Sequence, residues 1–313
     1  MTDCVIQAHR LTRYFGTNCA ADQVSFAIPR GCIAALLGRN GSGKTTIMRM
    51  LLGLLEPTRG ASTVLGHSSL AIPPEIRSRI GYVAEGHPLY GWMTVGQLAE
   101  HQSAFYRTWN RAIYRSIIDH FQLSDTARSG SLSRGQRAGV ALALALAPEP
   151  ELLVLDDPSL GLDPVARRAI LEVIINVWSA GGGGERTILL STHELQDVER
   201  IADRVLLLDH SVLVADADKD YFLSHVREYV AEVDEDGPLQ LRAKEIRGLV
   251  STRREGKLLR LLVANADTDT QQAIAAVTGT LAQERDVSLE DAVIAYLSRR
   301  GSALDERAMG GAA

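Results

Sequence analysis

Residues 38–45, Gly-Arg-Asn-Gly-Ser-Gly-Lys-Thr, match the pattern G-x-x-x-x-G-K-[ST] of a phosphate-binding loop. The glycines allow a tight turn that brings backbone N–H groups up to phosphate oxygens. The Lys44 amine can reach the terminal phosphates, and the Thr45 hydroxyl can bind Mg²⁺. An apolar run over 33–37 predicts a buried parallel strand before the loop, and apolar spacing predicts a helix over 44–55 after it. Because a helix N-terminus favours an anion, the sequence predicts a nucleotide site here.

Two adjacent carboxylates, Asp156 and Asp157, end the apolar run 152–155. Burial of two acids at a strand end is costly unless something compensates their charge. Beside a phosphate loop the natural compensation is Mg²⁺, held by Asp156 through water. Successive strand residues point to opposite sides, so Asp157 points elsewhere and can act on a water molecule.

Other polar residues follow apolar segments in the same way. Glu85 follows the predicted strand 80–83, and His193 follows the predicted strand 187–190. In an open parallel sheet this edge is where ligands bind, which favours a phosphate-facing role for His193. Ser133 precedes the buried helix predicted over 138–147, and the loop at its cap leaves N–H groups for an anion.

Tyr14 and Phe15 are adjacent aromatic residues before a glycine, in a chain with only 5% aromatic residues. This pattern fits the stacking of a nucleobase and fits equally well an aromatic packed at a strand end. The residues alone leave both readings open.

The elements needed to position these residues alternate between strand and helix and predict an α/β fold with a mostly parallel core sheet. Short strands over 5–11, 24–28 and 61–65 accompany it, and helices are expected between about 88 and 148. We expect one domain over 1–216 and a small α+β domain over 217–300, with a hairpin over 248–263 and helices over 269–277 and from 288. Residues 301–313 are expected to be disordered.

Composition narrows the possible functions. The 313 residues are 46% hydrophobic with a net charge of −5, which argues against a general nucleic-acid binder. The three cysteines, Cys4, Cys19 and Cys32, show no metal-binding spacing and predict free thiols in a reducing compartment. The N-terminus does not look like a signal peptide, and no apolar run approaches the roughly 20 residues of a spanning helix. Any membrane part must therefore come from another chain.

Together and in this order, the motifs resemble the ATP-binding cassette (ABC) ATPases, the nucleotide-binding subunits of ABC transporters. The resemblance covers about residues 5–215, and the residues after Ala217 are similar to C-terminal extensions of some exporter ATPases. It implies a P-loop NTPase fold with an antiparallel β subdomain and a helical subdomain, and it implies ATP and Mg²⁺ as cofactors.

The resemblance also implies roles. Phe15, with Tyr14 as the alternative, matches the aromatic that stacks on adenine. The phosphates are cradled by Gly38, Arg39, Asn40, Gly41, Ser42, Gly43, Lys44, Thr45 and Thr46. Magnesium is held by Thr45, Asp156 and Glu85, the last in the place of a glutamine that also senses the membrane partner. Asp157 occupies the position of the catalytic glutamate, His193 that of the switch histidine, and Asp163 a turn at the dimer interface. The γ-phosphate of the opposite subunit is bound by the signature residues Ser133, Gly135 and Gln136.

By the same resemblance, two cassettes face head to tail, with each ATP between one phosphate loop and the signature of the other. The second ATPase subunit can be identical or different. The cassettes act on integral-membrane permease subunits at the cytoplasmic face of the membrane, no nucleic acid is involved, and export is favoured over import.

Besides Glu85, two further departures from the family pattern affect these expectations. Asp157 is one methylene shorter than glutamate, which withdraws its carboxylate by about 1.5 Å, whereas a general base must lie within roughly 2.6–3.2 Å of its water. We therefore expect slow but measurable ATP hydrolysis. Arg134 replaces the first glycine of the signature and either points away from phosphate or adds a positive charge there, the first being favoured. A regulatory subunit that binds ATP beside a catalytic partner and hydrolyses little of it is the alternative function.

Overall fold

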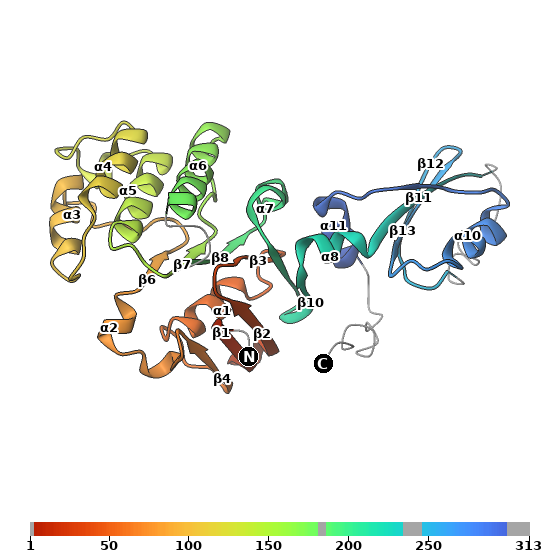
Figure 1. Ribbon diagram of the computed structural model, residues 1–313, viewed down its shortest axis with the longest axis horizontal. Helices are drawn as coiled ribbons and strands as arrows, with labels where there is room; N and C mark the ends of the chain where they lie inside the picture. Colours follow the sequence, from red (N-terminus) through yellow and green to blue (C-terminus); the bar gives the residue numbers. More distant parts are fainter. Residues whose placement is uncertain (1–2, 181–185, 234–245, 299–313) are drawn as a thin grey trace. The chain divides into compact units, whose positions relative to one another are not determined.

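The computed structural model describes residues 3–180, 186–233 and 246–298 (Figure 1). The chain divides into two compact units, Met1–Asp216 and Ala217–Ala313, and each is described by itself. None of the helices in the described ranges is both long and apolar enough to cross a membrane.

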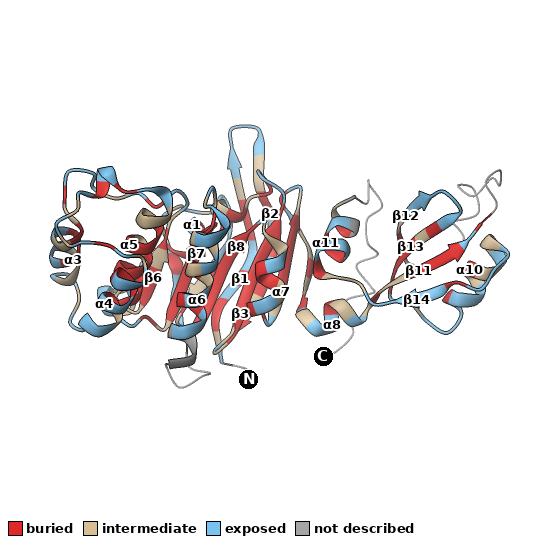
Figure 2. Ribbon diagram, turned by 90° about the horizontal axis from the view of Figure 1, so that it is seen from above, coloured by how far each residue is buried: buried red, intermediate tan, exposed pale blue. Residues whose placement is uncertain are grey.

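A six-stranded sheet forms the centre of the first unit, with the strand order β10-β9-β3-β8-β7-β6. Neighbouring strands from β9 to β6 are parallel. Every residue of β3, β7 and β8 is buried, as apolar strands covered on both faces require (Figure 2). The strands are β3 (Ile33–Gly38), β6 (Ile80–Val83), β7 (Leu152–Asp156), β8 (Thr187–Thr192), β9 (Arg204–Asp209) and β10 (Val212–Asp218).

A four-stranded antiparallel sheet accompanies it, with the order β2-β1-β4-β5. Its strands are β1 (Cys4–Phe15), β2 (Asn18–Pro29), β4 (Arg59–Val64) and β5 (His67–Ser68). Strands β1 and β2 are longer than the sequence predicted, and they meet in a hairpin at Gly16. Apolar residues of β1, β2, β3 and α1 (Lys44–Leu51) share one core. The predicted mostly parallel sheet and antiparallel subdomain are thus confirmed.

Helix α1 ends earlier than the sequence predicted, at Leu51 rather than residue 55. Gly53 adopts φ 69°, and a Cβ there would lie 2.1 Å from the Ser69 carbonyl oxygen. A left-handed glycine is a common helix terminator. It turns the chain into a loop that leads through β4 and β5 to a short 3-10 turn (Ser69–Ala71) and α2 (Pro74–Arg77).

Helices α3 (Val95–Ser103), α4 (Arg111–His120) and α5 (Arg134–Leu146) gather beside the β6 end of the parallel sheet (Figure 1). Each is capped at its N-terminus by a side chain, from Thr94, Asn110 and Ser133 respectively. Helices α6 (Pro164–Ala180) and α7 (Leu195–Ile201) follow strands β7 and β8 in the chain.

The second unit is an antiparallel sheet with helices, in the strand order β12-β13-β11-β14. The predicted hairpin is formed by β12 (Leu249–Glu255) and β13 (Leu258–Ala264), and α10 (Thr270–Thr278) contributes Ile274 to the core of the sheet. The remaining elements are α8 (Lys219–Ser224), β11 (Val226–Glu232), β14 (Gln283–Arg285) and α11 (Leu289–Ser298). The predicted α+β class is confirmed for this unit, while the predicted disordered segment 301–313 lies outside the described residues.

Candidate functional site

Strand β3 leads through the glycine loop directly into helix α1, the local order that the sequence predicted. Two glycines of the loop have no room for a side chain. A Cβ on Gly38 would lie 2.4 Å from the Leu208 carbonyl oxygen, and a Cβ on Gly43 would lie 2.0 Å from the Ala20 carbonyl oxygen. Both residues have positive φ, 153° and 105°, so glycine is required for backbone conformation as well as for space.

A cavity of about 490 Å³ opens at this loop. It brings together residues from the hairpin tip, the loop, and the carboxyl ends of β6, β7 and β8, as expected for one edge of a parallel sheet. Its lining consists of Phe15, Asn18, Ala20, Asn40, Gly41, Gly43, Lys44, Thr45, Thr46, Glu85, Asp156, Asp157, Leu160 and Ser191. Gly38, Arg39 and Ser42 lie in the same loop without lining the cavity.

Lys44 is the cation of this cavity, and its residue is 8% exposed. Its amine donates hydrogen bonds to the carbonyl oxygens of Gly38, at 2.8 Å, and Arg39, at 3.1 Å. Burial lowers the pKa of Lys44, while the carboxylates of Asp157, Asp156 and Glu85 act in the opposite direction. A positive charge thus stands among three acids at the mouth of the loop.

Asp156 is 1% exposed and only partly satisfied by hydrogen bonds. Its Oδ1 accepts from the hydroxyls of Thr45 and Ser191, each at 2.9 Å, whereas its Oδ2 is buried without a partner. The strand register explains the Ser191 contact, because Ser191 on β8 is the direct partner of Asp156 on β7. The sequence analysis assigned no role to Ser191. Its position near His193 at the end of a strand could have indicated that it belongs to the site.

These groups fit a magnesium ion that is completed by phosphate. A buried carboxylate oxygen without a partner and a neighbouring hydroxyl are ligands that Mg²⁺ accepts, and this ion usually keeps only one or two carboxylates beside water and phosphate oxygens. No cluster of three or more histidine, cysteine or acidic side chains suited to a metal occurs within the described ranges.

Asp157 has an unusual backbone and a fixed side chain. Its φ is 44°, and its N–H donates to the carbonyl oxygen of Ser191 at 3.1 Å and to the Ser191 hydroxyl at 3.0 Å. Its Oδ2 accepts from Nδ1 of His193 at 2.9 Å, while Oδ1 is buried without a partner. Burial raises the pKa of Asp157, and His193 acts most strongly against that rise. Left-handed conformation in a non-glycine residue is costly and is often found at functional sites.

His193 therefore lies against the Asp157 carboxylate. Its side chain is 37% exposed, and its Nε2 lies 3.6 Å from Oε1 of Glu194. The sequence assigned His193 to a phosphate and did not anticipate its contact with Asp157. His193 does not line the cavity of the phosphate loop.

The signature residues are placed differently. Ser133 and Gln136 form a reciprocal capping box at the start of α5, with N–H to oxygen distances of 3.1 and 3.2 Å. Gly135 packs against α6, since a Cβ on it would lie 2.7 Å from the Cβ of Ala166. None of the three lines the phosphate-loop cavity.

Arg134 lies over the turn that follows Asp157. A Cβ on Gly161 would come within 2.8 Å of Nη1 of Arg134, so the arginine side chain rests on the Gly161 backbone of its own chain. Asp163, at the end of this turn, caps α6 by accepting hydrogen bonds from the backbone N–H groups of Val165 and Ala166.

The two candidate stacking residues separate in the structure. Phe15 lines the phosphate-loop cavity, whereas Tyr14 lines a different cavity of about 520 Å³ beside Arg10, Gln23 and Arg59. The register of β1 and β2 shifts between Arg13 and Tyr14, which helps set where the two rings lie.

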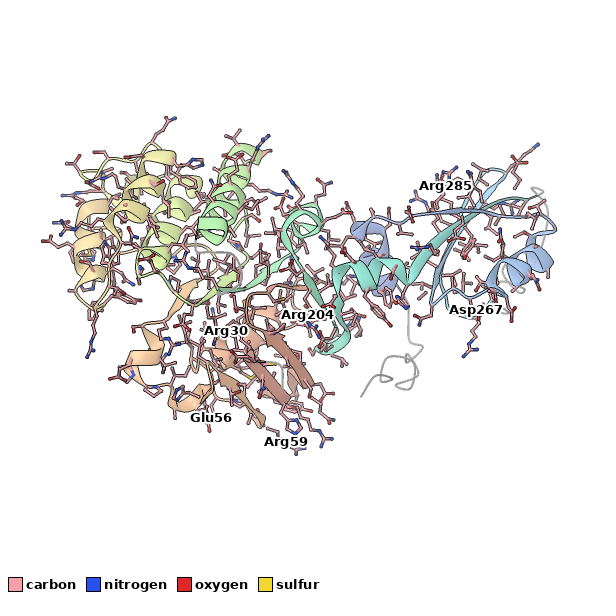
Figure 3. The ribbon with its side chains drawn as sticks, viewed as in Figure 1. Arg30, Glu56, Arg59, Arg204, Asp267 and Arg285 are labelled. Carbon is pink, nitrogen blue, oxygen red and sulfur yellow. The ribbon has the colours of Figure 1, made fainter. Side chains whose placement is uncertain are left out.

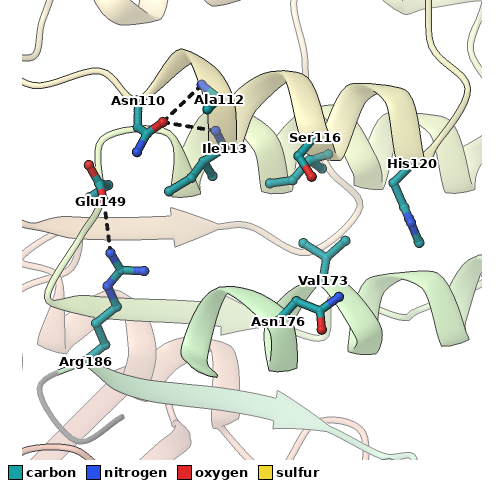
Figure 4. Close-up of a pocket in the computed structure, with 10 residues that line it drawn as sticks. Asn110, Ala112, Ile113, Ser116, His120, Glu149, Val173, Asn176 and Arg186 are labelled. Atoms are coloured by element: carbon teal, nitrogen blue, oxygen red, sulfur yellow. Dashed lines mark hydrogen bonds and ion pairs between the residues drawn. The ribbon is translucent and has the colours of Figure 1, made fainter. Parts of the chain in front are cut away.

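A further cavity of about 410 Å³ lies between α4 and α6 (Figure 4). Ile113 and Val173 contribute apolar surface to it, and an ion pair between Glu149 and Arg186, 3.3 Å long, lies at one end. It contains none of the residues that the sequence singled out.

The fold and the loop define a P-loop NTPase, and comparison with known proteins gives its family. The sequence profile of the ABC transporter family matches residues 21–160. A Nod factor export ATP-binding protein I from Bradyrhizobium diazoefficiens is 34% identical over 242 residues, which cover 74% of this chain and 77% of that protein. This chain belongs to the family of ABC transporter ATP-binding proteins, as its sequence motifs predicted.

Two further comparisons also match ABC transporter ATP-binding proteins. The probable multidrug ABC transporter ATP-binding protein YbhF from Escherichia coli is 36% identical over 224 residues, 70% of this chain but 38% of YbhF. The matched part thus spans less than half the length of that relative. A solved structure of an ATP-binding subunit of an ABC transporter matches with a TM-score of 0.62 and 30% identity, covering 70% of this chain and 92% of that one.

Proposed function

We propose that this chain binds and slowly hydrolyses MgATP to drive solute export through separate membrane subunits. The observation that carries the proposal is the Asp156 carboxylate, which is buried beneath the phosphate loop with one oxygen bonded to Thr45 and the other unpartnered. A buried carboxylate oxygen without a partner is suited to a cation, and the adjacent loop is suited to an anion. MgATP supplies both.

In this mechanism the loop N–H groups and Lys44 would bind the β- and γ-phosphates, while Thr45, Asp156 and Glu85 would hold magnesium. When bound, the ion would supply charge neutralisation at the phosphates. To bind phosphate, Lys44 would exchange its hydrogen bonds to the Gly38 and Arg39 carbonyl oxygens for phosphate oxygens in the cavity that it lines.

Asp157 acts as the general base through Oδ1, because Oδ2 already accepts from His193. His193 orients the carboxylate by donating from Nδ1, and its Nε2 lies 3.6 Å from Oε1 of Glu194. The shorter aspartate places the base further from the water than a glutamate would, which supports the expectation of slow hydrolysis.

A second cassette completes the site. Ser133, Gly135 and Gln136 lie outside the cavity of their own phosphate loop, yet Ser133 caps a helix whose first N–H groups suit an anion. We therefore assign them to the γ-phosphate bound by the partner cassette. An ATP shared between two sets of N–H groups favours the closed pair through its higher affinity for that state.

The permease partner is assigned to an exposed group of rings that follows Glu85. Tyr90, Trp92 and Phe105 are 58, 71 and 70% exposed. His101 joins them, with ring centroids 6.1 Å from Tyr90 and 5.2 Å from Phe105. Exposed aromatic side chains of this kind mark protein–protein contacts. With a permease as the partner, we assign the chain to the cytoplasmic face of the membrane, and the export-related names of its relatives support export.

A specific observation favours the alternative of a regulatory subunit with little hydrolysis. Among the described residues, Oδ2 of Asp157 lies 2.9 Å from Nδ1 of His193, so this oxygen of the carboxylate already has a side-chain partner. If the hydrogen bond between Asp157 and His193 keeps the carboxylate from acting on a water when ATP is bound, the nucleotide would hold two cassettes together without being cleaved. A catalytic partner would then be needed.

The deciding experiment is Mg²⁺-dependent ATP turnover by the purified chain, with ATP affinity measured in parallel. Lys44→Ala supplies the blank. Turnover above the blank supports the transport ATPase, and ATP binding with turnover equal to the blank, both alone and with added permease, supports the regulatory subunit. Absence of ATP binding by the wild-type chain would refute both.

A further inference from the structure

The tip of the β1–β2 hairpin carries an arginine that has no part in the proposed mechanism. The guanidinium carbon of Arg13 lies 4.7 Å from the centroid of the Phe15 ring. Arg13 and Phe15 are two positions apart on β1, so they share one face of the strand. A guanidinium over an aromatic face is attracted by the quadrupole of the ring.

Arg13 is also held from its other side. Its Nη1 donates to the backbone carbonyl oxygen of Glu56 at 2.9 Å, and its Nε is buried without a partner. The arginine thus lies between the Phe15 ring and the loop after α1. Glu56, which belongs to this loop, is labelled in Figure 3. A confined guanidinium loses little additional freedom when it stacks on a ring.

The same loop binds the hairpin tip at two further points. The backbone N–H of Tyr14 donates to the Thr58 hydroxyl at 3.1 Å, and the backbone N–H of Thr58 donates to the Thr12 carbonyl oxygen at 2.8 Å. Because this loop continues from α1, the helix that begins at Lys44, the position of the Phe15 ring is tied to the element that binds the phosphates.

Phe15 also borders the cavity. The residue is 47% exposed and lines the phosphate-loop cavity, while Arg13 does not line it. The ring therefore has Arg13 against one face and open space toward the phosphates. An aromatic face with a cation behind it gives up electron density to that cation, which strengthens stacking with an electron-rich nucleobase on the free face.

We propose that Arg13 is a positioning residue for the nucleobase, which holds the Phe15 ring and prepares its free face for adenine. The proposal rests on the proposed function, since it requires a nucleotide in the cavity. It assigns the contribution of Arg13 to the base alone, so a ligand with phosphates and no base should not depend on it.

The test compares the affinities of ATP and inorganic tripolyphosphate, both with Mg²⁺, for the wild-type chain and its variants. The variants are Arg13→Ala, Arg13→Gln, Phe15→Ala and the double variant of Arg13→Ala with Phe15→Ala, beside one control. Arg13→Ala should weaken ATP about two- to fivefold, the range expected for an exposed cation–π contact, and should leave tripolyphosphate unchanged. Arg13→Gln keeps an N–H donor for Glu56 without the charge and should also weaken ATP. In a Phe15→Ala background, Arg13→Ala should cause no further loss.

Arg10→Ala is the matched control. Arg10 lies on the same strand and donates to Gln23 at 3.0 Å, but it faces the other cavity, so ATP affinity should not change. Equal losses for ATP and tripolyphosphate, an undiminished effect without the Phe15 ring, or no effect of Arg13→Ala on ATP would each overturn the proposal. Failure of the wild-type chain to bind either ligand would instead refute the proposed function.

Discussion

The Asp157 carboxylate has one oxygen bonded to His193 and one buried oxygen without a partner, which the proposed mechanism assigns to the attacking water. The hydrogen bond to His193 sets the direction of the carboxylate, and the left-handed backbone at φ 44° sets the position of its Cβ. The length of the side chain is then the one variable that decides the distance from Oδ1 to the water. This makes residue 157 the place where the rate of hydrolysis can be changed most simply.

We expect Asp157→Glu to raise the rate of ATP turnover roughly ten- to a hundredfold, because a displacement of the order of 1 Å can cost about a hundredfold. Asp157→Asn should reduce turnover to that of Lys44→Ala, since the amide cannot accept the proton. Steady-state ATPase measurements at saturating MgATP check both. Equal turnover by the wild-type chain and Asp157→Glu would show that the aspartate already reaches its water.

The pH dependence of turnover follows from the surroundings of the same residue. Burial raises the pKa of Asp157, and a general base is active only when deprotonated. Turnover should therefore fall on acidification at a higher pH than an ordinary aspartate would give. His193 is the strongest influence that lowers this pKa, so His193→Ala should move the acid limb to still higher pH.

The measurement is a pH–rate profile of the residual turnover of His193→Ala, with His67→Ala as the control because His67 lies on β5, in the antiparallel sheet. An acid limb that stays in place or moves to lower pH would contradict the assigned role of His193.

At the scale of elements, the turn between β7 and α6 is packed beneath the start of α5. Gly161 adopts φ 69° with Arg134 2.8 Å from where its Cβ would be, and Gly135 is in similarly close contact with Ala166 on α6. The signature loop and the turn after Asp157 thus pack together. The contact of Gly161 with the long Arg134 side chain is flexible, and that of Gly135 with Ala166 is rigid.

Gly161→Ala should destabilise the chain by about 1–2 kcal/mol from the left-handed backbone alone, with an additional cost from displacing Arg134. The control is Gly66→Ala, because Gly66 has φ 79° and no atom within 4 Å of its Cβ position. In an Arg134→Gly background the cost of Gly161→Ala should fall to that of the control. Chemical denaturation of the four variants measures the coupling, and additive effects would show that Arg134 does not support this turn.

How far the elements could be predicted depended on how uniformly they are buried. Strands β3, β7 and β8 are apolar runs buried throughout, and their ends brought the phosphate loop, Asp156 and Ser191 to one edge. Strands β10 and β11 carry charged residues and are only partly buried, so no apolar run marked them. The contact between Asp157 and His193 joins two separate strand ends and depends on strand order and backbone conformation, which no local pattern contains. The choice between Tyr14 and Phe15 likewise depended on a register shift.

At the scale of the whole molecule, the proposed function assigns one cassette two half-sites, and these do not share a cavity within the chain. The phosphate-loop cavity contains Lys44 and Asp156 but none of the signature residues, although the capped start of α5 is suited to an anion. If two copies complete each other's sites, a defect in the phosphate loop and a defect in the signature can be placed in different chains. This distinguishes a composite site from one that works within a single cassette.

We therefore expect Lys44→Ala and Ser133→Arg chains to be inactive separately and active when mixed. A mixed pair places an intact phosphate loop opposite an intact signature at one of its two sites, while the other site carries both defects. Random pairing in an equal mixture makes half of the pairs mixed, so turnover should recover to roughly a quarter of the wild-type value for a symmetric dimer. The control is a mixture of Lys44→Ala with Asp156→Ala, whose defects fall on the same half-site and cannot complement. Recovery in the control, or none in the test mixture although both variants remain folded, would contradict the shared site.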